Sequence, residues 1–287
     1  MTEPVAQEGI IRLYLCTDGP LVEANGRFFS IRDAGWDDLF NDPALGERLT
    51  QYTRNALETE PPRPDDLLAP IGHQEVWAAG VTYWRSRTAR MAESEETADA
   101  YDRVYTAARP EIFFKATPHR VAGPCQAVRI RRDTRWSVPE PELAVAVNAA
   151  GKAFGYAIGN DMSARDIEGE NPLYLPQAKV YDQCCGLGPC ILVSEEPPGP
   201  DTSIRLVVER SGAVAFEGAT TLGKLRRSIE ELVSWLLLDN SFPDGCFLLT
   251  GTGIVPPDDF TLTSGDRIRI AIDSIGALEN YVVQDAA

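Results

Sequence analysis

Histidine is scarce in this sequence: only His73 and His119 occur among the 287 residues. The six cysteines include no Cys-x-x-Cys pair, so a zinc site built from cysteine and histidine has little support. Cys184 and Cys185 are adjacent, which is a poor start for a disulfide framework. We therefore expect reduced thiols and a cytoplasmic location.

Long apolar runs and a targeting segment are also missing. Residues 1–9 lack the basic and apolar regions of a signal peptide. No apolar stretch approaches the roughly 18 to 20 residues that a membrane-spanning helix needs. The sequence therefore predicts a protein that has no membrane partner.

Positive charge is scarce relative to negative charge. The 27 Lys and Arg residues stand against 43 Asp and Glu residues, which gives a formal net charge of −16. Because a phosphate-binding face needs clustered cations, this balance argues against nucleic acid as a partner. An anionic substrate would have to be held by local positive charge, from a metal ion or from a few basic side chains.

The remaining composition is that of an ordinary globular protein, with 44% hydrophobic and 24% charged residues. This length allows one large domain, or a catalytic domain with a smaller partner. The prolines and acidic residues of segment 58–66 predict a linker. It would divide a small N-terminal domain, residues 1–68, from a catalytic domain, residues 69–287.

Strand-like segments dominate the sequence. Apolar runs bounded by turn residues predict strands at 10–16, 27–32, 75–80, 112–114, 127–130, 143–148, 153–158, 204–210, 213–217 and within 262–283. Helices are expected at 43–58 and 224–239, and the polar stretch 83–108 is expected to form a surface lid. Because regular β-α alternation is missing, we predict a β-rich α+β fold rather than a doubly wound sheet.

Three carboxylates are candidates for a metal site. Glu140 and Glu142 open a predicted strand and project to the same side, where they repel each other unless a cation or a proton lies between them. The hairpin that turns at 150–152 brings Asp161 opposite this end of the strand. Three carboxylates without a soft ligand suit Mg²⁺ or Mn²⁺. Alternatively, these acids could simply decorate a solvent-facing strand start.

Several motifs occur in the order typical of one family. They are PEPELAV at 139–145, GYAIGNDMSARD at 155–166, LGP at 187–189, LTGTG at 249–253, SGD at 264–266 and IGALEN at 275–280. On these motifs the chain resembles the fumarylacetoacetate hydrolase superfamily over roughly residues 75–283. The resemblance implies sheets rolled around a metal site, Glu140, Glu142 and Asp161 as the ligands of a divalent metal, and a homodimer or homotetramer.

Two further segments indicate a branch of this family. EIFFKATPHR at 111–120 and IEGENPLYLPQAK at 167–179 are similar to the branch that dehydrates 2-keto-3-deoxypentonates. The family's hydrolases usually carry a histidine in the lid, whereas the matching stretch TYWRSR at 82–87 has none. The resemblance therefore implies Mg²⁺-dependent removal of water from a small anionic 2-oxo acid, such as 2-dehydro-3-deoxy-D-arabinonate, giving 2,5-dioxopentanoate.

The resemblance also implies roles for individual residues. Lys179 and Glu111 are the acid–base pair, with Lys179 as the base and Glu111 as the acid, or the reverse. A lysine close to a divalent cation is expected to have a lowered pKa. The loop 250–253 either brings backbone amides and the Thr252 hydroxyl to the substrate carboxylate or is a plain turn. Arg85 and Ser86 are expected to reach substrate oxygens from the lid.

Two other functions stay open at this point. Hydrolysis of an acylpyruvate or another diketo acid would cleave a carbon–carbon bond, whereas dehydration conserves the carbon skeleton. A non-catalytic ligand-binding protein of the same fold would need neither Lys179 nor Glu111. No nucleotide site is expected, because Leu225 follows the glycine–lysine spacing of residues 218–224 where a phosphate-binding loop needs Ser or Thr.

Overall fold

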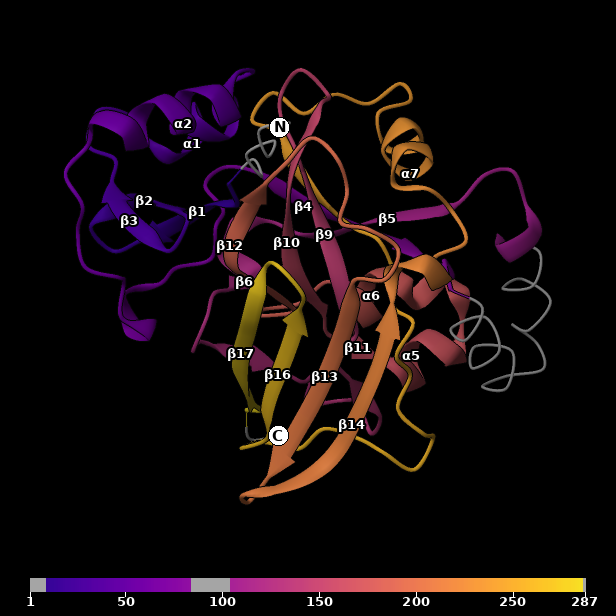
Figure 1. Cartoon of the computed structure of the whole chain (residues 1–287). Coiled ribbons are helices and arrows are strands. Elements are labelled where there is room, and N and C mark those ends of the chain that lie inside the picture. Colours follow the sequence, from indigo (N-terminus) through magenta and orange to yellow (C-terminus); the bar gives the residue numbers. More distant parts are fainter. Residues whose placement is uncertain (1–8, 84–103, 286–287) are drawn as a thin grey trace, which may run out of the picture.

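A computed structural model describes residues 9–83 and 104–285, and within them a ten-stranded sheet forms the centre of the molecule (Figure 1). In the order in which they pair, its strands are β3 (Arg27–Ser30), β2 (Gly19–Ala24), β1 (Ile11–Cys16), β12 (Cys185–Val193), β10 (Ala153–Asp161), β9 (Pro141–Val147), β15 (Cys246–Leu249), β4 (Glu75–Gly80) and β5 (Glu111–Ala116), while β6 (Val121–Ala122) pairs with β12.

A second sheet of five strands packs against the first. Its strands are β14 (Ala213–Thr221), β13 (Ser203–Arg210), β16 (Arg267–Ile272), β17 (Gly276–Val283) and β7 (Ala127–Arg129), and β8 (Ser137–Val138) and β11 (Ser163–Ala164) form a separate pair. Within residues 9–83 and 104–285, the α-helices are α1 (Trp36–Phe40), α2 (Leu45–Asn55), α5 (Arg165–Glu170), α6 (Leu175–Lys179) and α7 (Ile229–Leu236). The predicted β-rich α+β class is confirmed.

The central strand β9 is buried on both faces, which explains its continuous apolar sequence. Successive side chains of a strand point to opposite faces. Leu143, Val145 and Val147 therefore enter the core shared with the five-stranded sheet and α7. Ala144 and Ala146 enter the core on the other face, which also contains the buried side chains of α1 and α2.

Phe40 of α1 anchors the N-terminal helices to the central sheet. Its ring centroid lies 4.9 Å from that of Phe154 and 5.2 Å from that of Phe247, both in edge-on geometry. Truncating a buried phenylalanine to alanine typically costs about 3–5 kcal/mol of stability. The helices at the left of Figure 1 are therefore an integral part of the folded structure.

The N-terminal strands continue the central sheet. β1 pairs antiparallel with β12, with Arg12 opposite Leu192. The proline-rich segment after α2 also contacts these strands, because Thr59 N donates to Phe28 O at 2.8 Å and Leu68 N to Leu15 O at 2.8 Å. A domain boundary at residue 68 stays a prediction.

The ten-stranded sheet is strongly rolled. β5 is four positions from β10 in the order of pairing. A flat sheet would separate these strands by about 19 Å, since neighbours lie about 4.8 Å apart. Yet Lys115 Nζ of β5 lies 2.5 Å from Asp161 Oδ1 of β10. The sheet must therefore curl back on itself, as the predicted rolled architecture requires.

Helix α7 is shorter than the helix predicted at 224–239. The Ser228 side chain accepts a hydrogen bond from Glu231 N, so Ser228 is the N-cap and the helix begins at Ile229. Leu225 precedes the helix and follows a single 3₁₀ turn, Leu222–Lys224. The apolar periodicity therefore predicts a helix start that is too early, because it ignores the N-cap residue Ser228.

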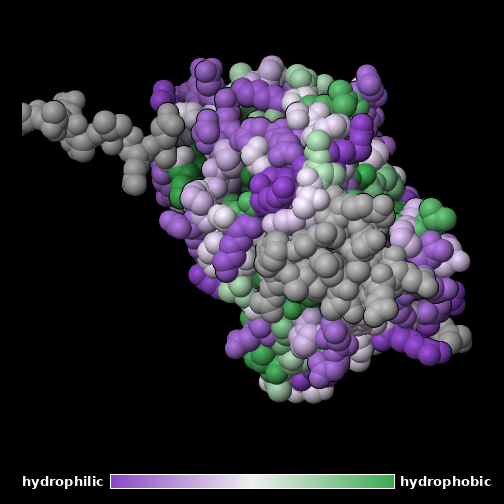
Figure 2. All heavy atoms as spheres, turned by 90° about the vertical axis from the view of Figure 1, so that its right-hand side faces the viewer, coloured by the Kyte–Doolittle hydropathy of each residue, from purple (hydrophilic) through white to green (hydrophobic). Residues whose placement is uncertain are grey.

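The surface is polar where Figure 2 displays described residues, with hydrophobic residues in small separate groups. This agrees with the excess of acidic residues in the sequence. Among residues 9–83 and 104–285, no helix combines the length and hydropathy that crossing a membrane would require.

Candidate metal centre

The β9–β10 hairpin brings three buried carboxylates together. Gly159 pairs with Glu142, and Asp161 N donates to Glu140 O at 2.9 Å, so Asp161 meets the start of β9. One side-chain oxygen from each of Glu140, Glu142 and Asp161 lies within 4.8 Å of the others. The predicted juxtaposition is confirmed. The alternative of solvent-facing acids is wrong, because each of the three is at most 3% exposed.

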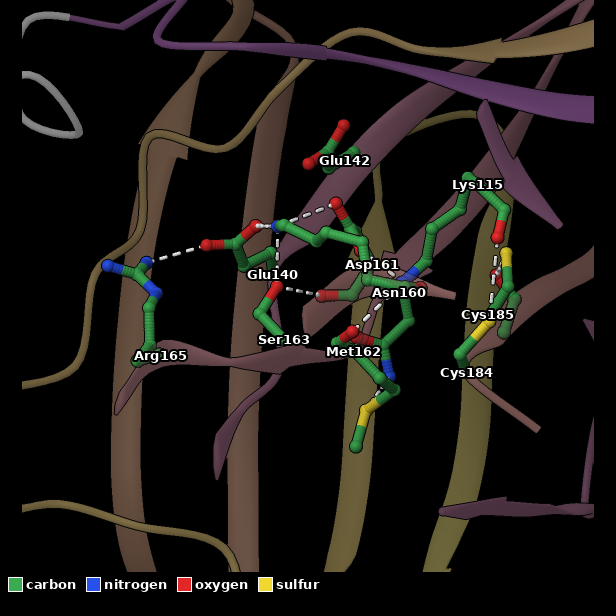
Figure 3. A network of polar contacts seen from close by, with 12 residues as sticks. Lys115, Glu140, Glu142, Asn160, Asp161, Met162, Ser163, Arg165, Cys184 and Cys185 are labelled. Atoms are coloured by element: carbon green, nitrogen blue, oxygen red, sulfur yellow. Dashed lines mark hydrogen bonds and ion pairs between the residues drawn. The ribbon is translucent and has the colours of Figure 1, made fainter. Parts of the chain in front are cut away.

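Each of these carboxylates has one oxygen held by a group at the outside of the cluster. Arg165 Nη2 donates to Glu140 Oε1 at 2.6 Å, and Lys115 Nζ forms an ion pair with Asp161 Oδ1 at 2.5 Å. In Figure 3, Arg165 approaches Glu140 from one side, and Lys115 lies on the other side, beyond Asp161. The backbone amide of Gly251 donates to Glu142 Oε2 at 2.5 Å.

Lys179 occupies the inner side of the cluster. Its Nζ donates to Glu140 Oε2 at 2.6 Å, to Asp161 Oδ2 at 2.9 Å and to Ser163 Oγ at 2.6 Å. The side chain is 2% exposed and belongs to the last residue of α6. Lys179 therefore contacts the carboxylate oxygens that Lys115 and Arg165 leave available.

The electrostatics of the cluster favour a cation. Burial, together with repulsion from Asp161 and Glu140, raises the pKa of Glu142 well above its ordinary value. A bound divalent cation would reverse this effect, because opposite charge favours the ionised carboxylate. Lys115 behaves differently: burial alone would lower its pKa, but attraction to Asp161, together with smaller contributions from Cys184 and Cys185, outweighs burial and raises it. Lys115 therefore stays charged at neutral pH.

The donor set fits a hard divalent cation. Three carboxylates present oxygen, the ligand atom that Mg²⁺ and Mn²⁺ prefer. Among the described residues that line the pocket there is neither a cysteine nor a histidine. Glu140, Glu142 and Asp161 would therefore hold the metal, with water or substrate completing its coordination.

A pocket opens onto this cluster from the side of β4 and β5. Besides the three carboxylates, its described lining includes Glu111, Phe113, Glu168, Lys179, Gly251 and Thr252. Glu111 is the first residue of β5 and pairs with Gly80. A Cβ on Gly80 would lie 2.0 Å from Glu111 Oε2, so the carboxylate covers this glycine. The two predicted acid–base residues therefore share one pocket.

The glycine-rich loop 250–253 supports the cluster. Gly251 has a φ of +90°, and a Cβ there would meet Thr82 Oγ1 at 1.9 Å and Ala79 O at 2.9 Å. Its amide is used to bind Glu142. Thr252 lines the pocket, while its hydroxyl accepts a hydrogen bond from Ile254 N at 3.2 Å. Its predicted contact with substrate stays a prediction.

Other predicted site residues lie elsewhere. Arg85 and Ser86 lie outside the described residues. His73 is exposed and bonded to Asp37, and His119 is exposed and bonded to Thr117. Neither of the two histidines of the chain lines the pocket.

Lys115 and Arg165 also belong to the cluster, although the sequence motifs that contain them predict no role for either residue. A usable signal was the presence of one lysine in the otherwise apolar run Ile112–Ala116, since a lysine is rarely buried without a charged partner. Glu168, 3% exposed and in the pocket wall, gave no comparable signal.

Comparison with known proteins agrees with this geometry. Residues 77–283 match the family described as fumarylacetoacetate (FAA) hydrolase C-terminal. A Haloferax volcanii protein described as a probable 2-keto-3-deoxyxylonate dehydratase is 48% identical over 214 residues, which cover 74% of this chain and 73% of that protein. The 2-dehydro-3-deoxy-D-arabinonate dehydratase of Saccharolobus solfataricus is 44% identical over 246 residues, 83% of this chain and 82% of that protein.

A solved structure is also similar to this chain. It is a 2-keto-3-deoxy-D-arabinonate dehydratase complexed with magnesium and 2,5-dioxopentanoate, with a TM-score of 0.80 and 35% identity. The match covers 97% of this chain and 100% of that chain. The similarity therefore includes the N-terminal strands as well as the metal-centre region.

Proposed function

The chain belongs to the fumarylacetoacetate hydrolase family, and we propose that it is a Mg²⁺-dependent dehydratase of a 2-keto-3-deoxy sugar acid such as 2-dehydro-3-deoxy-D-arabinonate. The observation that carries the proposal is the position of Lys179, which contacts the inner oxygens of Glu140 and Asp161 while Glu111 lines the same pocket. Similarity to two dehydratases over 73% and 82% of their lengths supports it.

Glu140, Glu142 and Asp161 are proposed to hold Mg²⁺, and Mn²⁺ suits the same oxygen ligands. The chemistry that the metal supplies when bound is polarisation of the 2-oxo group, which acidifies the C3 protons of the substrate. The similar structure that contains magnesium and 2,5-dioxopentanoate supports both the metal and the product.

Elimination of water requires two proton transfers. One group removes a proton from C3, and another gives a proton to the C4 hydroxyl so that it leaves as water. The resulting 5-hydroxy-2-oxopent-3-enoate then isomerises to 2,5-dioxopentanoate: C5 and its hydroxyl each lose a proton, and C3 and C4 each gain one. Lys179 lies against the inner oxygens of Glu140 and Asp161, so a 2-oxo acid bound to a metal there through its 2-oxo group would have C3 on the side of Lys179. We assign removal of the C3 proton to Lys179 and protonation of the C4 hydroxyl to Glu111. The pH profiles of single variants distinguish this order from the reverse.

The positions of the two histidines argue against hydrolysis of a diketo acid. Hydrolysis of a diketo acid needs a base that activates water, and histidine is the most frequent residue in that role. The chain has only two histidines, and both are exposed and outside the pocket. The acid–base groups among the described residues of the pocket are instead Lys179 and the carboxylates. This set suits an elimination better than water activation by imidazole.

The test is a turnover experiment with metal-stripped protein. EDTA-treated protein is incubated with 2-dehydro-3-deoxy-D-arabinonate, with and without added Mg²⁺, and the products are identified by mass spectrometry. We expect Mg²⁺-dependent loss of one water with all five carbons retained. Formation of pyruvate would indicate carbon–carbon cleavage, and binding without turnover would indicate a ligand-binding protein.

The proposal also includes an oligomeric state and a cellular location. We propose a homodimer or homotetramer, a state that the exposed apolar side chains Val214, Leu238 and Tyr281 would suit, since they are 58%, 56% and 47% exposed. We also propose a cytoplasmic location, because six free cysteines suit a reducing compartment. Size-exclusion chromatography with light scattering tests the first of these statements.

A further inference from the structure

Lys115 is fully buried at the outer side of the metal centre. Its side chain is 0% exposed, and it projects from β5, the strand that begins with Glu111. Its Nζ donates to Met162 O at 2.9 Å and to Lys179 O at 2.6 Å, and it forms the ion pair with Asp161 Oδ1 at 2.5 Å. Two hydrogen bonds and one ion pair, all to protein groups, thus surround the ammonium group. Lys115 therefore acts on its neighbours rather than on a substrate.

Because of the contact with Lys115, the two oxygens of the Asp161 carboxylate have different partners. Oδ1 faces Lys115, while Oδ2 faces the inner side of the cluster, where Lys179 contacts it. Glu140 is divided in the same way between Arg165 and Lys179, and one oxygen of Glu142 is bound by the Gly251 amide. A metal would therefore compete with Lys179 for the inner oxygens of Glu140 and Asp161, and each carboxylate would contribute a single oxygen to it.

Carboxylates that bind through one oxygen (monodentate ligands) suit some divalent cations better than others. Mg²⁺ requires a compact octahedral set at about 2.0–2.1 Å and usually keeps several waters. Ca²⁺ takes about 6–8 oxygens at longer distances and often gains two of them from one bidentate carboxylate. A centre whose carboxylates each offer one oxygen therefore favours the smaller ion.

We propose that Lys115 is a positioning residue that sets the metal selectivity of this centre, by confining Asp161 to one ligand oxygen and so favouring Mg²⁺ over Ca²⁺. This inference deepens the proposed function and rests on its metal centre. Lys115 also holds the backbone carbonyl of Lys179, at the end of α6. The same ammonium thus orients a proposed metal ligand and the proposed base.

The test measures binding of each metal alone, without substrate. The dissociation constants of Mg²⁺ and Ca²⁺ are determined by isothermal titration calorimetry for metal-free wild-type protein and for Lys115→Met. Methionine keeps most of the length of lysine but removes the charge and all three donors, so Asp161 Oδ1 becomes available. We expect the preference for Mg²⁺ over Ca²⁺ to fall by about tenfold, which corresponds to about 1.4 kcal/mol.

A matched control separates this effect from the general loss of a buried ion pair. Arg210 pairs with the buried Asp266 at 2.7 Å, and neither residue lines the pocket. Arg210→Met should leave the ratio of the two dissociation constants unchanged. An unchanged ratio in folded Lys115→Met would overturn the proposal.

Two further measurements test the proposed metal selectivity if Lys115→Met does not fold. Lys115→Gln retains an amide donor but not the charge, and we expect a smaller shift of the ratio in the same direction. The wild-type protein alone supplies the second measurement, because tighter binding of Ca²⁺ than of Mg²⁺ would contradict the proposal. Since no substrate is present, failure of the proposed dehydration would leave these results unaffected.

Discussion

Lys179 Nζ lies 2.6 Å from Oε2 of Glu140, and both side chains are buried. The oxygen concerned is the one that Arg165 does not occupy, because Arg165 contacts Oε1. A group that can accept and release a proton therefore adjoins the oxygen that Glu140 would offer to a metal. The proposed chemistry depends on this adjacency.

Replacing Lys179 by methionine should impair catalysis without impairing metal binding. General acid–base groups typically contribute about 10²–10⁴-fold to the rate, so we expect kcat for dehydration to fall by that amount. Mg²⁺ affinity, measured by calorimetry, should not fall, because the variant lacks a cation that competes for Glu140 and Asp161. Lys152→Met is the control, since Lys152 is exposed and pairs with Glu195. A Lys179→Met variant with the kcat of the wild type would remove Lys179 from the mechanism.

Gly80→Ala should displace the Glu111 carboxylate. The added Cβ would lie 2.0 Å from Oε2 and 2.7 Å from Cδ of Glu111, so the side chain must move while the strand can stay in place. A displacement of about 1 Å can cost about 10²-fold in rate, and we expect kcat to fall by that order with the melting temperature little changed. Gly46→Ala is the matched control, because nothing lies within 4 Å of the Cβ position there. Equal kcat values for the two variants would show that the position of Glu111 is unimportant.

Mg²⁺ should stabilise the folded protein. Binding to the folded state alone raises the free energy of unfolding by about 2.7 kcal/mol when Mg²⁺ is present at about 100 times its dissociation constant. Urea unfolding with Mg²⁺ or with EDTA measures this difference. Glu142→Gln should abolish it, because the variant loses one of the three ligand carboxylates. Equal stabilisation of wild type and variant would place the bound metal elsewhere.

The Asp37–His73 pair at the start of α1 should make stability depend on pH. Burial would raise the pKa of Asp37, but hydrogen bonds from Gln74 and His73 outweigh it and hold the pKa below its ordinary value. A hydrogen bond and the charge of Asp37 raise the pKa of His73. The carboxylate contribution is thus present above the unfolded pKa of about 3.9 and is lost as pH falls through the lower folded value.

The histidine contribution has the opposite sign. It is fully present below the unfolded pKa of about 6.5 and is lost as pH rises through the raised folded value. We therefore expect the urea midpoint of the wild type to decline from about pH 6.5 to pH 8 more than that of His73→Ala. Because His73 is exposed, the difference should be small. Parallel pH dependences of the two proteins would exclude a role of this pair.

The sequence could predict the carboxylate cluster because its geometry is local. Side chains alternate along β9, and a short hairpin fixes the register with β10, so Asp161 must return beside Glu140 and Glu142. The prediction needed only the turn at 150–152, where Gly151 has a φ of +77°.

The surrounding cations could not be predicted in this way. Lys115 reaches Asp161 only because the central sheet rolls through four strand positions. Strand patterns do not encode how far a sheet rolls, so a lysine in β5 could not be assigned a partner in β10. The different partners of the two oxygens in each carboxylate therefore depend on the tertiary structure. For the same reason, the metal selectivity proposed for Lys115 emerged only from the three-dimensional structure.

The central claim is that this centre dehydrates a 2-keto-3-deoxy sugar acid and does not cleave diketo acids. One reaction containing equal amounts of 2-dehydro-3-deoxy-D-arabinonate and an acylpyruvate, with Mg²⁺ present, tests it most directly by mass spectrometry. We predict that the sugar acid loses one water to give 2,5-dioxopentanoate while the acylpyruvate is unchanged. Consumption of the acylpyruvate with release of pyruvate, and no change in the sugar acid, would contradict the account.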